Sequence, residues 1–212
     1  MSITNPTSSI ATPLAAWQRL RAGNERFYQP INGQRRGLIA ERPTAAVFRC
    51  SDAGIAGETV FGQSWGSLID VSTWGHVVDS GVLATLEHAV AGRDVPLIVV
   101  LGHHDCHAMR AAVRAWNEAD MPRDATRATV EQTMASIVRR GIKTDSVESV
   151  SAAHIVETGL ALLERSAIIA RRVEAGQCAI VCGSTEPDTG RIRVYGTVGS
   201  VGELNDSLLE CV

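Results

Sequence analysis

The chain has 212 residues, of which 20 are lysine or arginine and 23 are aspartate or glutamate, so its formal net charge is −3. This length fits a single domain built around one hydrophobic core, residues 1–212. Because charges of both signs are scattered along the chain, we expect no basic face for a phosphate backbone, and nucleic acid is not an expected partner.

The first residues, MSITNPTSSIATP, have neither the basic opening nor the apolar stretch of a secretory signal. No run anywhere reaches the roughly 18 apolar residues of a membrane-spanning helix. We therefore expect a cytoplasmic protein with no membrane partner, and we expect residues 1–12 to be flexible.

The N-terminal part predicts a helical arm at residues 13–29. Thr12 can cap this helix, Pro13 suits its first turn, and apolar residues recur along one side. Because the arm comes before any predicted strand, it is free to lie across a neighbouring subunit.

Five apolar segments rich in β-formers follow, and helical patterns separate them. The predicted strands are residues 44–50, 67–73, 95–102, 178–185 and 191–199. The predicted helices are a short one at 57–63, one at 79–93 capped by Asp79, one at 105–116, and long helices within 126–175 that break around 141–145.

Strands alternating with helices predict an α/β fold with a mostly parallel central sheet flanked by helices. The turn signal PDTG before the last strand is too short for a crossover, so that strand must be antiparallel. The expected sheet therefore has about four parallel strands and one antiparallel edge strand.

Two cysteines and a histidine stand where such a sheet binds ligands, beyond the carboxyl ends of its strands. Cys50 ends the first strand, and His103 and Cys106 follow the third in the sequence GHHDC. Two thiolates and one imidazole suit Zn²⁺ and leave a fourth position for water or another side chain. Asp52, two residues after Cys50, is the candidate for that position.

The other three cysteines need no functional explanation. With five cysteines in all, an odd number, a disulfide framework is not indicated. Cys178 and Cys182 lie an even number of residues apart on one strand, so both should face the core as small apolar side chains.

At these residues the sequence resembles the β-class carbonic anhydrases, whose motifs are C-x-D-x-R after the first strand and H-x-x-C after a later one. The resemblance runs from about Trp17 to Gly202 and includes PTAAVFRCSD, TWGHVVDSGVLATLEHAV and VPLIVVLGHHDC. It implies zinc ligands Cys50, His103 and Cys106, and a dimer or a dimer of dimers. It also implies reversible hydration of carbon dioxide to bicarbonate by zinc-bound hydroxide.

In this family the aspartate that matches Asp52 is the catalytic carboxylate. It either binds zinc or accepts the hydrogen bond of the attacking hydroxide. An arginine two residues later pairs with it and holds it off the metal, but this chain has Gly54 at that position. The resemblance therefore implies a zinc site whose carboxylate lacks its usual partner, and hydration could be attenuated.

Three further departures are expected near the metal, in a possible substrate pocket with Gly54. Ser72 stands where relatives often have a second arginine, Trp74 replaces a small residue in the T-x-G turn, and His107 replaces the glycine after the ligand cysteine. His107 is expected either to cap the helix it opens, or to act as a proton shuttle or substrate contact.

Three functions remain open from the sequence. The first is a carbonic anhydrase type of lyase. The second is a related hydrolase of another small substrate such as carbonyl sulfide or carbon disulfide, which the reshaped pocket motivates. The third is a catalytically silent zinc protein in which Cys50, Asp52, His103 and Cys106 close a tetrahedral shell.

Overall fold

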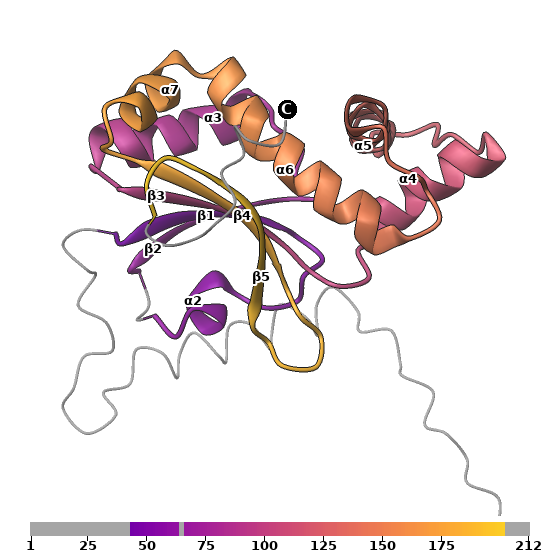
Figure 1. Cartoon of the computed structure of the whole chain (residues 1–212), viewed down its shortest axis with the longest axis horizontal. Coiled ribbons are helices and arrows are strands. Elements are labelled where there is room, and N and C mark those ends of the chain that lie inside the picture. Colours follow the sequence, from indigo (N-terminus) through magenta and orange to yellow (C-terminus); the bar gives the residue numbers. More distant parts are fainter. Residues whose placement is uncertain (1–42, 64–65, 202–212) are drawn as a thin grey trace, which may run out of the picture. The chain divides into compact units, whose positions relative to one another are not determined.

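The computed structural model describes residues 43–63 and 66–201, all of which belong to one compact unit, Ile39–Val212 (Figure 1). The predicted helical arm at 13–29 and the flexible stretch at 1–12 lie outside the described residues. No helix among the described residues is long and apolar enough to cross a membrane.

The described residues form a single five-stranded sheet in the order β2-β1-β3-β4-β5. The strands are β1 (Ala45–Cys50), β2 (Leu68–Thr73), β3 (Leu97–Gly102), β4 (Ala179–Thr185) and β5 (Ile192–Val198). The first four strands pair in parallel, and β5 pairs antiparallel with β4 at the edge. This arrangement confirms the predicted α/β fold and its antiparallel edge strand.

Helices lie on both sides of the sheet. They are α2 (Gly57–Val60), α3 (Ser80–Glu87), the π-helical turn η1 (His88–Gly92), α4 (His107–Glu118), α5 (Arg127–Arg140), α6 (Val147–Arg165) and α7 (Ala167–Glu174). In Figure 1, α3, α6 and α7 cover one face and α2 lies on the other side, while α4 and α5 extend beyond the sheet.

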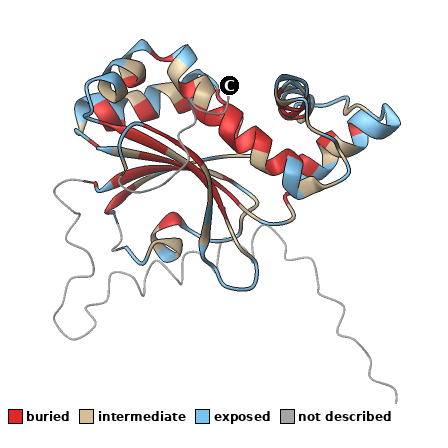
Figure 2. Cartoon of the chain, viewed as in Figure 1, coloured by how far each residue is buried: buried red, intermediate tan, exposed pale blue. Residues whose placement is uncertain are grey.

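The main core lies between the sheet and the covering helices. Phe48 and Ile98 of the sheet are fully buried against Leu86 of α3 and Ile155 of α6. Figure 2 shows the buried residues along the central strands and the inner side of α6. Near-continuous burial of β1 and β3 is typical of parallel strands covered on both faces.

Residues with strong cap preferences predicted most helix ends correctly. The Asp79 carboxylate accepts the Val82 N–H at 2.8 Å and caps α3, and Gly141 ends α5 with a positive φ of 59°. One break was missed, at Ser166. This residue ends α6, and its hydroxyl accepts the Ile169 N–H at 3.1 Å and so starts α7.

Cys178 and Cys182 are buried in the main core and form no disulfide, as expected. Burial raises the pKa of the Cys178 thiol to about 11 and that of the Cys182 thiol to about 12. Both side chains are therefore neutral and act as apolar packing groups.

Candidate metal centre

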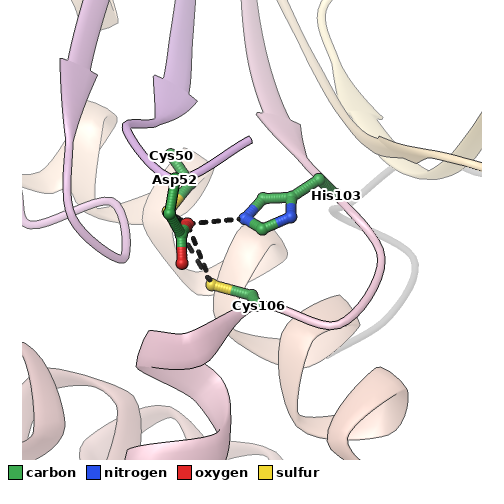
Figure 3. Close-up of side chains that lie close together, drawn as sticks. All are labelled: Cys50, Asp52, His103 and Cys106. Atoms are coloured by element: carbon green, nitrogen blue, oxygen red, sulfur yellow. Dashed lines mark hydrogen bonds and ion pairs between the residues drawn. The ribbon is translucent and has the colours of Figure 1, made fainter. Parts of the chain in front are cut away.

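The four predicted ligand residues come together where β1 and β3 end (Figure 3). One ligand atom from each of Cys50, Asp52, His103 and Cys106 lies within 4.8 Å of the others. The parallel pairing of β1 with β3 explains this, because it places the ends of both strands at the same edge of the sheet. Residues more than 50 positions apart thus form one cluster.

The spacing of the two cysteine sulfur atoms fits a tetrahedral ion. The two sulfur atoms, Sγ of Cys50 and Sγ of Cys106, are 3.7 Å apart. Two thiolates bound to zinc at about 2.3 Å in a tetrahedron stand about 3.8 Å apart. Oδ1 of Asp52 lies 2.6 Å from the Cys50 sulfur and 2.8 Å from Nε2 of His103, so a carboxylate oxygen is available for the fourth corner.

The orientation of His103 suits a metal ligand. Its Nδ1–H donates to the backbone carbonyl of His104 at 2.9 Å, which leaves Nε2 directed at the cluster. Burial acts to lower the pKa of His103, but the neighbouring Cys50 and Asp52 outweigh it, and the pKa is raised. The imidazole is thus held in an environment that favours positive charge.

The two buried thiols differ in acidity. The hydrogen bond with Cys50 lowers the pKa of Cys106, and the backbone N–H groups at the start of α4 add to this effect. The pKa of Cys50 is raised, because its thiol shares a hydrogen bond with Cys106 and is buried. Cys106 is therefore the readier thiolate of the pair.

Asp52 is ionised at neutral pH. Partial burial acts to raise the pKa of this carboxyl, while the hydrogen bond from Cys50 and the charge of His103 act in the opposite direction. Two hydrogen bonds from His107 add to them, and the pKa comes to about 2. The cluster therefore combines a carboxylate, two thiols and an imidazole, and with the thiols and the imidazole deprotonated this donor set suits a divalent cation.

A tight turn between β2 and α3 donates a backbone hydrogen bond to Cys50. The Gly75 N–H donates to the Cys50 sulfur at 3.2 Å. Gly75 has a φ of 69°, and a Cβ there would lie 2.4 Å from Cγ2 of Thr129 and 2.7 Å from Cβ of Ala108. Only glycine fits this backbone and this space.

Three side chains hold the turn in place. The Thr129 hydroxyl donates to the Trp74 carbonyl at 3.2 Å, and Nε2 of His154 lies 2.9 Å from the Gly75 carbonyl. Nε2 of His76 lies 2.9 Å from the Leu101 carbonyl on β3. His76 therefore ties the turn to β3.

The residues predicted for a substrate pocket are spread around the cluster. Gly54 and Ser72 are exposed, and Trp74 packs against the apolar group that contains Cys50 and Cys106. His107 contacts Asp52 directly.

A cavity of about 290 Å³ lies beside His103. It is lined by residues of the β4–β5 hairpin, among them Ser184 and Tyr195, and by Glu148 of α6. None of the four predicted pocket residues lines this cavity, so their part in substrate binding stays a prediction.

The family described as Carbonic anhydrase matches residues 45–192, which include all four clustered residues. Carbonic anhydrase 2 of Mycobacterium tuberculosis is 39% identical over 203 residues, which cover 90% of this chain and 97% of that protein. The chain belongs to the carbonic anhydrase family.

Solved structures agree on the fold of the β class within this family. The β-carbonic anhydrase CcaA superposes with a TM-score of 0.74 at 18% identity, over 92% of this chain and 97% of that one. Tetrameric β-carbonic anhydrases of Sordaria macrospora give a TM-score of 0.61 at 20% identity, over 84% and 91% of the two chains. The resemblance inferred from the motifs is thus confirmed.

Two contributors to the site were not anticipated as such. The bond from the Gly75 N–H to Cys50 is a backbone contact, and the glycine of TWG was its only sequence signal. His154, on α6, had no signal at all, because a single histidine within a helical pattern does not reveal its partner.

Proposed function

We propose that this chain is a zinc-dependent carbonic anhydrase that catalyses the reversible hydration of carbon dioxide to bicarbonate. The observation that carries the proposal is the cluster itself. Four donor atoms of the types that zinc prefers lie within 4.8 Å of one another, in a chain that belongs to the carbonic anhydrase family.

Cys50, His103 and Cys106 would hold the ion, with Asp52 beside them. A zinc ion held there would lower the pKa of a water molecule toward about 7 and so would supply a nucleophile near neutral pH. The protein provides the rest. The buried thiols and the fixed imidazole keep the donor atoms in place, and the Gly75 N–H partly neutralises the charge on the Cys50 sulfur.

Asp52 is the proposed catalytic carboxylate. With its pKa at about 2 it stays ionised across the neutral range, and Oδ1 faces the three other donor atoms. An ionised oxygen at this place can accept a hydrogen bond from the attacking water and fix the direction of its lone pair. The same oxygen can instead occupy the fourth position and close the site, which would attenuate turnover.

The compartment and the assembly are also proposals. The four cysteines that the structure describes are all free, which supports a reducing compartment such as the cytoplasm. A homodimer or homotetramer is supported by the tetrameric relatives of similar fold.

The two alternatives from the sequence gain less support. Hydrolysis of carbonyl sulfide or carbon disulfide rested on a reshaped pocket, and the similar proteins are carbonic anhydrases by name. A silent zinc site rested on the missing arginine at Gly54, and Asp52 has other partners in the structure.

Stopped-flow carbon dioxide hydration tests the proposal, with zinc content measured on the same protein and the pH varied from about 6.5 to 9. Asp52→Asn should retain zinc and lose most of the rate, whereas Cys106→Ser should lose both. Release of sulfide from carbonyl sulfide is measured in parallel. Fully zinc-loaded protein that hydrates carbon dioxide no faster than buffer would contradict the proposal.

A further inference from the structure

The two oxygens of the Asp52 carboxylate have different surroundings. Oδ1 faces the Cys50 sulfur and Nε2 of His103, at 2.6 and 2.8 Å. Oδ2 accepts the backbone N–H of His107 at 3.2 Å and lies 3.1 Å from its Nδ1. Oδ1 therefore faces the metal cluster, while Oδ2 is held by two nitrogen atoms of His107.

The position of His107 in the fold makes this contact reliable. It is the first residue of α4, a helix of 12 residues, and it directly follows the ligand Cys106. Backbone N–H groups at a helix start have no partner within the helix, and they favour a nearby anion. The backbone bond thus brings the imidazole to the carboxylate, and the side chain adds a second donor.

Packing does not explain the orientation of His107. Its side chain is 73% exposed, whereas that of Asp52 is 20% exposed. Among the described residues, the hydrogen bonds that His107 makes outside its own helix both go to Asp52. The orientation of this exposed imidazole is therefore set by its hydrogen bond to the half-buried carboxylate of Asp52.

Gly54 cannot supply such a donor. It has no side chain, and its φ of 71° disfavours any other residue there, although a Cβ would meet nothing within 4 Å. The carboxylate must therefore be fixed from another direction.

We propose that His107 is the positioning residue of Asp52, its Nδ1–H and backbone N–H together holding Oδ2 so that Oδ1 stays directed at the metal ligands. The expected effect of His107 on turnover rests on the proposed function. The contact itself needs no change of protonation, because a neutral imidazole with its hydrogen on Nδ1 is a sufficient donor.

Two substitutions separate this role from others. His107→Ala removes the side-chain donor and keeps the backbone one. His107→Asn keeps a donor, because the amide nitrogen of asparagine stands at the same distance from the backbone as Nδ1, but it cannot carry a proton in turnover. His88→Ala, which changes an exposed histidine of η1 outside the site, is the matched control.

Two measurements are made on each variant at equal metal content. One is kcat for carbon dioxide hydration by the zinc protein. The other is the visible absorption spectrum of the cobalt(II) protein, which responds to the ligands around the metal whether or not turnover occurs. We expect His107→Ala to lower kcat about fivefold, as for loss of a solvent-exposed hydrogen bond to a charged group, and to shift the cobalt bands. His107→Asn should restore most of both.

Other results would overturn the inference. If His107→Ala leaves both kcat and the cobalt spectrum unchanged, His107 does not position Asp52. If His107→Asn is as slow as His107→Ala and added imidazole buffer restores both, the residue transfers protons instead. Should the wild-type protein show no hydration, the proposed function fails, and the cobalt spectra alone decide the role of His107.

Discussion

Gly75→Ala should be the most damaging small substitution near the site. The new Cβ would lie 2.4 Å from Cγ2 of Thr129 and 2.7 Å from Cβ of Ala108, on residues of two helices that pack together. Overpacking of this kind costs about 1–3 kcal/mol. The φ of 69° adds about 1–2 kcal/mol for a residue with a side chain. The sum is about 2–5 kcal/mol, or a fall of roughly 10 °C in Tm for a chain of this size.

Urea unfolding of Gly75→Ala beside Gly141→Ala separates the two contributions. Gly141 has a φ of 59° and nothing within 4 Å of an added Cβ, so its substitution carries only the backbone cost. Thr129→Ser added to Gly75→Ala removes the nearer methyl and keeps the hydroxyl bond to Trp74, so it should recover part of the loss. An equal loss of stability in the two glycine variants would refute the reasoning.

Three more predictions concern stability and metal retention. Burial lowers the pKa of His76 from 6.5 to about 3. Between these two pH values, only the unfolded state binds a proton at the His76 imidazole. His76 therefore costs no stability above pH 6.5, and at pH 5 it should lower the free energy of unfolding by about 2 kcal/mol. The free energy of unfolding of His76→Asn, measured in urea, should depend less steeply on pH. Cys106→Ser should lose zinc and fold stability together. In calorimetric scans with and without a chelator, the chelator should lower the Tm of the wild-type protein and leave the Tm of the variant unchanged. Arg140→Met should cost about 2–4 kcal/mol in urea unfolding, because it leaves the mostly buried Glu157 without its 2.6 Å partner, and Glu157→Gln in the same chain should recover much of it.

Features encoded by local pattern were predictable from the sequence. The apolar runs ending in Cys50 and Gly102 were predicted to be parallel strands, and their pairing in the structure brings Cys50 to His103. The turn PDTG required the antiparallel β5. Asp79 and Gly141 are residues with strong cap preferences, and both end or start helices where expected.

Features that depend on tertiary contacts were not predictable. Ser166 breaks the long helical segment, because its hydroxyl caps α7 and also donates to Glu87 at 2.6 Å. His107 was correctly placed at the start of a helix, but its partner proved to be Asp52, 55 positions earlier. The sequence shows which residues can donate, while only the folded structure, which brings the start of α4 to the residues that follow β1, shows which acceptor they meet.

The most direct test of the central claim is the metal content and coordination of the purified protein, by elemental analysis and X-ray absorption at the zinc edge. The account predicts about one zinc per chain, with two sulfur neighbours at about 2.3 Å and nitrogen or oxygen neighbours at about 2.0–2.1 Å. A protein that binds no zinc after reconstitution, or binds it without sulfur neighbours, would contradict the assignment of Cys50 and Cys106 as ligands.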